Sequence, residues 1–216
     1  DLSPAEADAL FVRPMGIPKT GVFGLYDLLG IDLMADVAKS LKNILPAGDE
    51  FHQYAQPIPL MTQMIANGQT GNKGGQGFYR DTDSGREVLN LATGKYTPTT
   101  RLQLALAKKA EAEGVEALLD DDSVYGRFAW QVLSSTLNYA AALIPEIGSN
   151  ILPIDDAMKL GYNWIYGPFE LLDQIGAQRV VERMQQEGRN VAPMLLLAAK
   201  KQGFYQVIDQ QLCSLH

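Results

Sequence analysis

Few side chains in this sequence combine the residue types and spacing that catalysis requires. The two histidines, His52 and His216, have no carboxylate or nucleophile at a spacing typical of a catalytic pair. A zinc site needs three or four ligands, which two distant histidines and the single Cys213 cannot supply. We therefore predict no catalytic residue and no metal site, with His52 in a polar surface loop and His216 as a terminal residue.

Two acidic features could in principle carry chemistry. Asp27 and Asp173 each lie three residues before a glycine that can end a helix, and a buried acid there could be catalytic. Neither has a basic or nucleophilic neighbour in sequence, which favours a structural hydrogen bond to the start of the next helix. The run Asp120–Asp122 could hold a metal, but it is more typical of a helix N-terminus, where carboxylates accept from free N–H groups.

The glycine-rich stretch Gly71–Gly77 could cradle a phosphate. It lacks the Lys-Ser/Thr pair of a P-loop, and it leads into the strand-like Phe78-Tyr79 rather than into a helix. No strand leads into it, so it also fails as a dinucleotide-binding turn. A tight turn is favoured, while Lys73 leaves the phosphate alternative open.

An internal repeat is the most informative feature of the sequence. Gly21–Gly30 and Gly167–Gly176 both read G-x-F-x-L-x-D-x-x-G. A Pro-containing segment and then Gly-Phe-Tyr follow in each half, at Gly77-Phe-Tyr79 and Gly203-Phe-Tyr205. The same order in both halves indicates a tandem duplication. We place the boundary near residues 95–100 and predict two domains, 1–97 and 98–216.

The apolar spacing predicts an all-α fold with one small β-hairpin. Ser3-Pro4-Ala5-Glu6 is a capping box, so a helix should begin at the start of the chain. The longest helix should run from Asp122 to Leu143, before Pro145. Further helices are predicted at 31–44, 57–67, 100–113, 177–187 and 191–202, and the hairpin at 77–91.

Composition excludes several classes of protein. Of the 216 residues 46% are hydrophobic and 20% charged, which is typical of a folded chain. The net charge of −7, without a basic patch, argues against nucleic acid and leaves an anionic ligand in need of a local positive site. Polar residues interrupt the most apolar stretch, 128–147, so we expect no membrane span. Residues 1–20 lack a signal-peptide pattern, and one cysteine fits a reducing compartment, so we expect a soluble, cytoplasmic protein.

Both halves resemble the C-terminal domain of the 3-hydroxyacyl-CoA dehydrogenase family. In the first half the resemblance lies in Ala7–Leu10, Gly16–Phe23 with Asp27, and the closing Gly71–Tyr79 turn. In the second half it lies in Asp155–Gly161 and Tyr166–Asp173. The form of the first copy is similar to that in multifunctional β-oxidation enzymes, and the resemblance covers nearly the whole chain.

This resemblance implies an enzyme that oxidises L-3-hydroxyacyl-CoA to 3-ketoacyl-CoA by passing a hydride to NAD. It places the NAD site and a catalytic His-Glu pair in an N-terminal nucleotide-binding domain that is not in this chain. The helical part would enclose the acyl-CoA substrate and make domain or dimer contacts. The implied partners are that nucleotide-binding domain, a fused enoyl-CoA hydratase and a second subunit in a homodimer.

Two departures from the family pattern limit what can be carried over. The first copy begins after the family's first long helix, which carries a substrate-facing asparagine. The second copy has that helix, but reads Gly126–Trp130 where the family has asparagine-arginine, and its Asn138 lies at a position used for packing. No catalytic residue is assigned to either copy. Candidate substrate-binding residues are Lys19, Thr20, Gly21 and Phe23, with a core position as the alternative for Phe23.

Two other functions are compatible with these residues. One is a helical interaction module that docks onto another chain without touching substrate. The other is a helical domain from a different dehydrogenase family that also follows a dinucleotide fold.

Overall fold

The computed structural model describes residues 2–11, 16–100, 102–144, 146–148, 150–208 and 211–214, and divides into two compact units. Unit 1 spans Asp1–Ala9 and Thr20–Leu104, and unit 2 spans Leu10–Lys19 and Ala105–His216. The division falls a few residues after the predicted boundary at 97, and the short segment 10–19 is grouped with unit 2. His216 and Pro145 lie outside the described residues.

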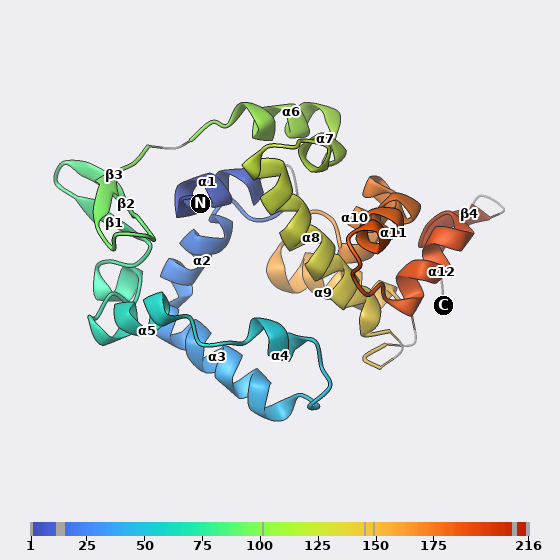
Figure 1. Cartoon of the computed structure of the whole chain (residues 1–216), viewed down its shortest axis with the longest axis horizontal. Helices are drawn as coiled ribbons and strands as arrows, with labels where there is room; N and C mark the ends of the chain where they lie inside the picture. The colour runs from blue at the N-terminus through green and yellow to red at the C-terminus, as the bar shows by residue number, and fades with distance from the viewer. Residues whose placement is uncertain are drawn as a thin grey trace. The chain divides into compact units, whose positions relative to one another are not determined.

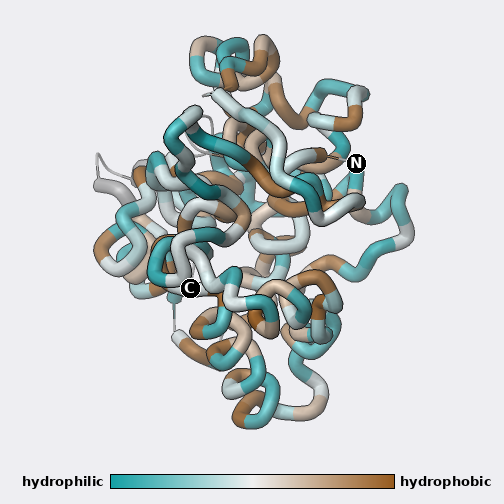
Figure 2. Tube along the Cα trace, turned by 90° about the vertical axis from the view of Figure 1, so that its left-hand side faces the viewer, coloured by the Kyte–Doolittle hydropathy of each residue, from teal (hydrophilic) through white to brown (hydrophobic). Residues whose placement is uncertain are grey.

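The fold class is all-α, as predicted (Figure 1). Apolar and polar stretches alternate along the chain trace (Figure 2), as helices with one buried and one solvated side require. No helix in the described ranges is both long and apolar enough to cross a membrane.

Unit 1 is built from short helices followed by a small sheet. Helix α1 contributes Pro4–Ala9 to unit 1, and its capping box forms, with the Ser3 backbone N–H donating to Glu6 at 2.8 Å. The full elements are α1 (Pro4–Phe11), α2 (Gly21–Leu29), α3 (Ile31–Ile44), α4 (Phe51–Tyr54), α5 (Pro59–Ala66), the 3-10 turn η1 (Asn72–Gly74), β1 (Tyr79–Thr82), β2 (Gly85–Leu89) and β3 (Tyr96–Pro98).

In unit 2 a similar series of short helices follows one long helix, α8, in the sequence. Ser123 begins α8, and its hydroxyl accepts from the Tyr125 and Gly126 N–H groups at 3.2 and 3.5 Å. The elements are α6 (Ala105–Glu113), α7 (Glu116–Leu119), α8 (Val124–Ala142), α9 (Leu152–Tyr162), α10 (Pro168–Ile175), α11 (Ala177–Gln186), α12 (Pro193–Lys201), β4 (Tyr205–Ile208) and β5 (Gln211–Ser214).

The strands differ from the prediction of one hairpin. The predicted hairpin is present as β1 and β2, with Tyr79 opposite Val88, and β3 extends it to a three-stranded antiparallel sheet. A second antiparallel pair, β4 and β5, follows the Gly-Phe-Tyr of unit 2 and was not predicted. Its flanking sequence lacks the Gly-containing turn that identified the first hairpin.

Two further predictions were wrong in detail. The helix expected over 100–113 begins only at Ala105, and Leu102 is exposed rather than on a buried helix face. His52 lies in α4 rather than in a loop, with a ring nitrogen 2.9 Å from the Pro46 carbonyl oxygen.

Each unit has its own core around the same pair of aromatic rings. In unit 1 the core is Ile31, Met64, Phe78 and Leu89, and Phe23 packs edge-on against Phe78 with centroids 4.8 Å apart. In unit 2 the rings of Phe169 and Phe204 are also 4.8 Å apart, and both side chains are fully buried. Fully burying a phenylalanine contributes about 1.5–3 kcal/mol, which applies to Phe78, Phe169 and Phe204, while Phe23 is half-buried.

Candidate functional site

In each unit, two buried or half-buried aspartates link earlier helices to the Gly-Phe-Tyr segment. In unit 1, Asp8 of α1 accepts from the Phe23 and Gly24 N–H groups at 2.8 and 3.0 Å, and from the Tyr79 hydroxyl at 2.9 Å. Asp27 accepts from the Phe78 and Tyr79 N–H groups at 2.8 and 2.7 Å. Tyr79 therefore donates to both acids, one through its side chain and one through its backbone.

Unit 2 contains the same arrangement. Asp155 of α9 accepts from the Phe169 and Glu170 N–H groups at 2.9 and 3.2 Å and from the Tyr205 hydroxyl at 2.7 Å. Asp173 accepts from the Phe204 and Tyr205 N–H groups at 2.7 and 2.8 Å. The same hydrogen bonds occur in both copies of the repeat, at matching sequence positions. This indicates that they stabilise the fold of each copy.

Glycines make room for these carboxylates. A Cβ atom on Gly21 would lie 2.3 Å from the Asp8 Cγ, and one on Gly167 would lie 2.2 Å from the Asp155 Cγ. Gly21 also has a φ of 70°, a backbone conformation that favours glycine. The first glycine of the G-x-F motif is thus explained by its approach to an acid on the preceding helix.

Burial raises the pKa of all four acids above the usual aspartate value, and the hydrogen bonds that they accept oppose this rise. Burial also raises the pKa of the hydroxyls of Tyr79 and Tyr205, and the neighbouring acids Asp8 and Asp155 add to that rise. The tyrosines therefore stay protonated and act as donors. Each acid thus links segments that are distant in the sequence but belong to the same unit.

The prediction for Asp27 and Asp173 was right about a structural hydrogen bond but wrong about its partner. Their partners are backbone N–H groups of Gly-Phe-Tyr, not the start of the next helix. The acids on the preceding helices, Asp8 and Asp155, were missed as members of the cluster. An aspartate that recurs upstream of the G-x-F phenylalanine in both copies was the signal that could have identified them.

The predicted substrate-binding residues lie at the start of α2, in two environments. Lys19 and Thr20 are exposed. Gly21 is buried against Asp8, and Phe23 is half-buried against Phe78, which matches the core alternative for Phe23. The four residues are neighbours in the sequence, but of the four only Lys19 and Thr20 are exposed to solvent.

The glycine-rich stretch forms a tight turn. Gly71 pairs with Gln76, and η1 lies between them. Lys73 extends to Asp32 at the start of α3, with Nζ 2.7 Å from Oδ2, and this contact lowers the pKa of Asp32. The turn then enters β1 rather than a helix, so it lacks the strand-turn-helix geometry of a dinucleotide-binding site.

Other candidate features have structural roles too. No group of three or more His, Cys, Asp or Glu side chains in the part of the chain that the structure describes could hold a metal ion. In the run Asp120–Asp122, Asp121 accepts from the Ser123 N–H at 2.9 Å, one residue before α8, while Ser123 itself caps the helix. The buried Asn138 accepts from the Ala192 N–H at 2.8 Å and donates to the Asn190 carbonyl at 3.3 Å, so it packs α8 onto the start of α12.

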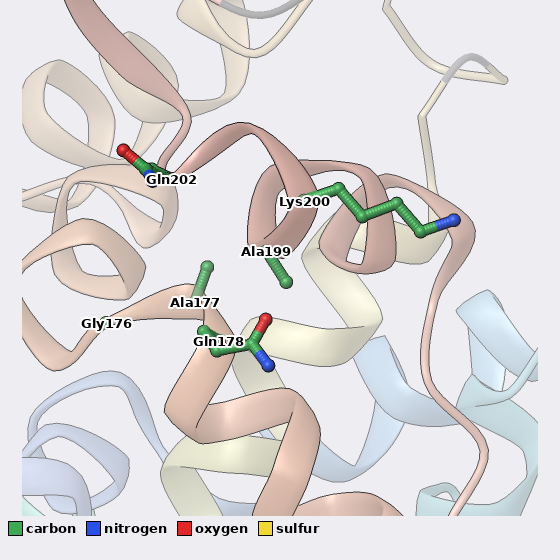
Figure 3. A pocket seen from close by; sticks show the side chains of 6 residues that line it. All are labelled: Gly176, Ala177, Gln178, Ala199, Lys200 and Gln202. Carbon is green, nitrogen blue, oxygen red and sulfur yellow. The ribbon is translucent and has the colours of Figure 1, made fainter.

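A shallow hollow of about 370 Å³ lies in unit 2 between the start of α11 and the end of α12 (Figure 3). Its lining is mostly small or amide side chains, and the Lys200 amine points away from Gln178 and Gln202 (Figure 3). The lining residues are Gly176, Ala177, Gln178, Ala199, Lys200 and Gln202. Among the described residues that line it there is no buried charged group, so this lining lacks the polar anchors of a ligand site.

Comparison with known proteins agrees with the repeat. The family model described as the C-terminal domain of 3-hydroxyacyl-CoA dehydrogenase matches two segments, residues 1–81 and 126–206. A Rickettsia prowazekii protein named as a fatty acid oxidation complex trifunctional enzyme is 35% identical over 98% of this chain and 29% of its own length. A Bacillus subtilis protein named as a 3-hydroxyacyl-CoA dehydrogenase is 35% identical over 86% of this chain and 24% of its own length.

A solved structure agrees at the level of the fold. The 3-hydroxybutyryl-CoA dehydrogenase of Escherichia coli superposes with a TM-score of 0.60 and 19% identity, covering 93% of this chain and 55% of that one. The chain therefore spans less than a third of the two relatives above and about half of this structure.

Proposed function

Because the chain belongs to the 3-hydroxyacyl-CoA dehydrogenase family, we propose that it is the helical C-terminal part of an enzyme that oxidises L-3-hydroxyacyl-CoA to 3-ketoacyl-CoA. The observation that carries the proposal is the double match to the family's C-terminal domain model. In both copies a tyrosine hydroxyl donates to an aspartate on an earlier helix, Tyr79 to Asp8 and Tyr205 to Asp155. Both copies therefore share the hydrogen bonds that join their helices to the Gly-Phe-Tyr segment.

In the reaction, the role of this chain is to bind and enclose the substrate, and the transfer of the proton and the hydride takes place at residues of another domain. Its buried acids are engaged by backbone and tyrosine donors, and its glycine-rich turn does not fit a dinucleotide. NAD, which accepts the hydride in this reaction, is bound by a nucleotide-binding domain elsewhere in the parent polypeptide. Fixing the thioester against that domain lowers the barrier through orientation.

The proposed substrate contacts are Lys19, Thr20, Gly21 and Phe23, of which Lys19 and Thr20 are exposed. In a chain with a net charge of −7, the exposed Lys19 amine provides a local positive charge for an anionic acyl-CoA. Lys19→Ala in the parent enzyme should raise KM and leave kcat unchanged. The matched control is Lys39→Ala, an exposed lysine in α3, which should change neither. An unchanged KM in Lys19→Ala would remove this residue from the substrate site.

The relatives named as trifunctional enzymes support a multifunctional parent that acts in fatty-acid β-oxidation. A fused enoyl-CoA hydratase, a homodimeric assembly and a cytoplasmic location complete the proposal. Hydration of an enoyl-CoA by the parent polypeptide and a measurement of its size in solution test the first two of these.

The decisive experiment compares residues 1–216 with the parent polypeptide. The parent should reduce NAD with L-3-hydroxyacyl-CoA, and residues 1–216 alone should not, as followed by NADH absorbance. Turnover by the short chain would contradict the assignment of the NAD site to another domain. A parent without turnover would favour the alternative, a helical module that docks onto another chain without touching substrate.

A further inference from the structure

The segment Leu10–Lys19 leads from α1 to α2 in the first copy of the repeat, yet it belongs to unit 2. We propose that unit 2 holds this segment so that Lys19 is presented to the acyl-CoA, with Ile165 and Phe128 as positioning residues. The second copy of the repeat then serves substrate binding without touching the substrate. The proposal rests on the proposed function, in which Lys19 is a substrate contact.

The repeat identifies the counterpart of this segment in the second copy. The G-x-F motifs begin at Gly21 and Gly167, and the residues before each glycine connect it to the preceding helix. At the two positions before the glycine, the first copy has Lys19-Thr20 and the second has Ile165-Tyr166. The first copy therefore presents a cation at this place, and the second presents an aliphatic and an aromatic side chain.

These two side chains of the second copy contact the segment at Gly16. The Ile165 N–H donates to the Gly16 carbonyl at 2.8 Å. A Cβ atom on Gly16 would lie 2.9 Å from the Ile165 Cβ and 3.2 Å from the Tyr166 Cδ2. Gly16 is buried and has a φ of 66°, a conformation that favours glycine. Ile165 is itself 65% exposed, so the contact is a narrow one, made by its backbone and its Cβ atom.

A second anchor lies at the start of the segment. Leu10 and Phe11 are 0% and 3% exposed. The Phe11 ring meets the ring of Phe128 in α8 edge to face, with centroids 5.5 Å apart, a geometry in which aromatic rings attract each other beyond the effect of burial. Unit 2 therefore holds the segment at two points.

The anchor at Gly16 restricts where Lys19 can lie. Three residues span at most about 11 Å, and Pro18 fixes its own φ and restricts the residue before it. On the other side of Lys19, Gly21 is anchored against a buried aspartate. The backbone of the exposed Lys19 is thus fixed in advance, and a ligand that binds its amine has less chain to order.

Proteolysis of the full chain of 216 residues tests the attachment of the segment. Gly16→Ala adds the Cβ atom that meets Ile165, and its matched control is Gly188→Ala in unit 2. Gly188 has a φ of 68° and nothing within 4 Å of its Cβ position, so the control carries the same backbone strain without the clash. Trypsin should cut the bond after Lys19 at least about fivefold faster in Gly16→Ala than in Gly188→Ala, because cleavage follows the population of the open segment. Equal rates, followed by mass spectrometry of the products, would overturn the attachment.

Kinetics of the parent enzyme test whether the attachment serves Lys19. Gly16→Ala should raise KM for the acyl-CoA by up to about fivefold and leave kcat unchanged, as expected when one exposed ion pair is weakened. Gly188→Ala should change neither. Gly16→Ala added to Lys19→Ala should raise KM no further, because its effect passes through the lysine. A further rise in the double variant, or an unchanged KM in Gly16→Ala or Lys19→Ala, would overturn the positioning role.

Phe128→Leu tests the second anchor. It removes the ring pair with Phe11 and should also raise KM, whereas Phe204→Leu, which removes a ring pair elsewhere in unit 2, should leave KM unchanged. Circular dichroism should show that both variants are folded at the assay temperature. An equal rise of KM in both would identify lost stability as the cause and would overturn the positioning role of Phe128.

Failure of this inference and failure of the proposed function give different results. A parent without turnover would overturn the role in acyl-CoA binding, while the proteolysis, which uses neither NAD nor substrate, would still show the attached segment. Equal cleavage rates with normal turnover would overturn the attachment and leave the proposed function standing.

Discussion

The Tyr79 hydroxyl donates to Asp8 at 2.9 Å, across 71 residues of sequence. The Tyr79 backbone N–H also donates to Asp27, so this one residue is hydrogen-bonded to both α1 and α2. Tyr205 closes unit 2 in the same way through Asp155 and Asp173.

Removing either hydroxyl should destabilise its own unit. Tyr79→Phe and Tyr205→Phe leave a buried carboxylate with one donor fewer, which costs about 1–3 kcal/mol. Urea unfolding followed by circular dichroism measures the loss. Tyr162→Phe, at a 64% exposed position, is the control and should be neutral. If all three variants unfold alike, the hydroxyls do not stabilise the units.

Adding a methyl group at Gly21 or Gly167 should also destabilise the unit that contains it. Gly21→Ala and Gly167→Ala place a Cβ atom against the Asp8 or Asp155 carboxyl, and Gly21 also has a positive φ. We expect losses of about 1–3 kcal/mol, as for an overpacked core. Gly161→Ala in α9 has open space around its Cβ position and should be neutral or stabilise by up to about 1 kcal/mol. A Gly167→Ala variant as stable as Gly161→Ala would contradict the close approach of Gly167 to Asp155.

The pH dependence of stability follows from the buried acids. Their pKa values are raised in the folded state, so the folded chain binds more protons than the unfolded chain between the unfolded and folded pKa values. The stabilisation is fully present below the usual aspartate pKa of 3.8 and is lost as pH rises through the folded values. The melting temperature should therefore rise as the pH is lowered from neutral through the raised pKa values of the folded chain.

High salt provides the control for this effect. Repulsion among surface charges in a chain of net charge −7 changes in the same direction, but salt screens it and leaves buried groups largely unaffected. A melting temperature that falls on acidification in high salt would be evidence against the raised pKa values.

Asn138 should contribute to stability and not to turnover. Asn138→Asp keeps the acceptor for the Ala192 N–H but loses the donor to the Asn190 carbonyl, and it buries a charge beside that oxygen. We expect a loss of about 1–3 kcal/mol in thermal or urea unfolding, with kcat of the parent enzyme unchanged below its melting range. A large loss of kcat with normal stability would place Asn138 in the catalytic machinery.

The helical frame could be predicted because each signal for it is local. The Ser3–Glu6 capping box and the glycines at 30 and 114 set helix ends through backbone geometry that neighbouring residues determine. The helix predicted over 31–44 matches α3 at both ends. In contrast, Leu102 and Leu104 belong to the apolar run that predicted a helix from residue 100, but α6 begins only at Ala105.

The hydrogen bonds of the four aspartates could be predicted only in part. Asp27 was recognisable from its fixed place in the repeat, but its partners are about 50 residues away, at Phe78 and Tyr79. Spacing along the chain carries no information about such a pairing, since it depends on how the helices pack. The exposure of Leu33 and Val37 in α3 was likewise not predictable, because these residues have the helical periodicity of buried positions.

The position of the closing tyrosine in each unit also sets an order for synthesis. Tyr79 and Tyr205 each follow every helix that their hydrogen bonds join, so neither unit can complete its ties until that residue has left the ribosome. Synthesis proceeds from the N-terminus, so the ties of the first unit can form while the ribosome is still translating α9 and α10. Nascent chains halted before Tyr79 has emerged from the ribosome should therefore be open to proteases, and chains halted after it has emerged should resist them.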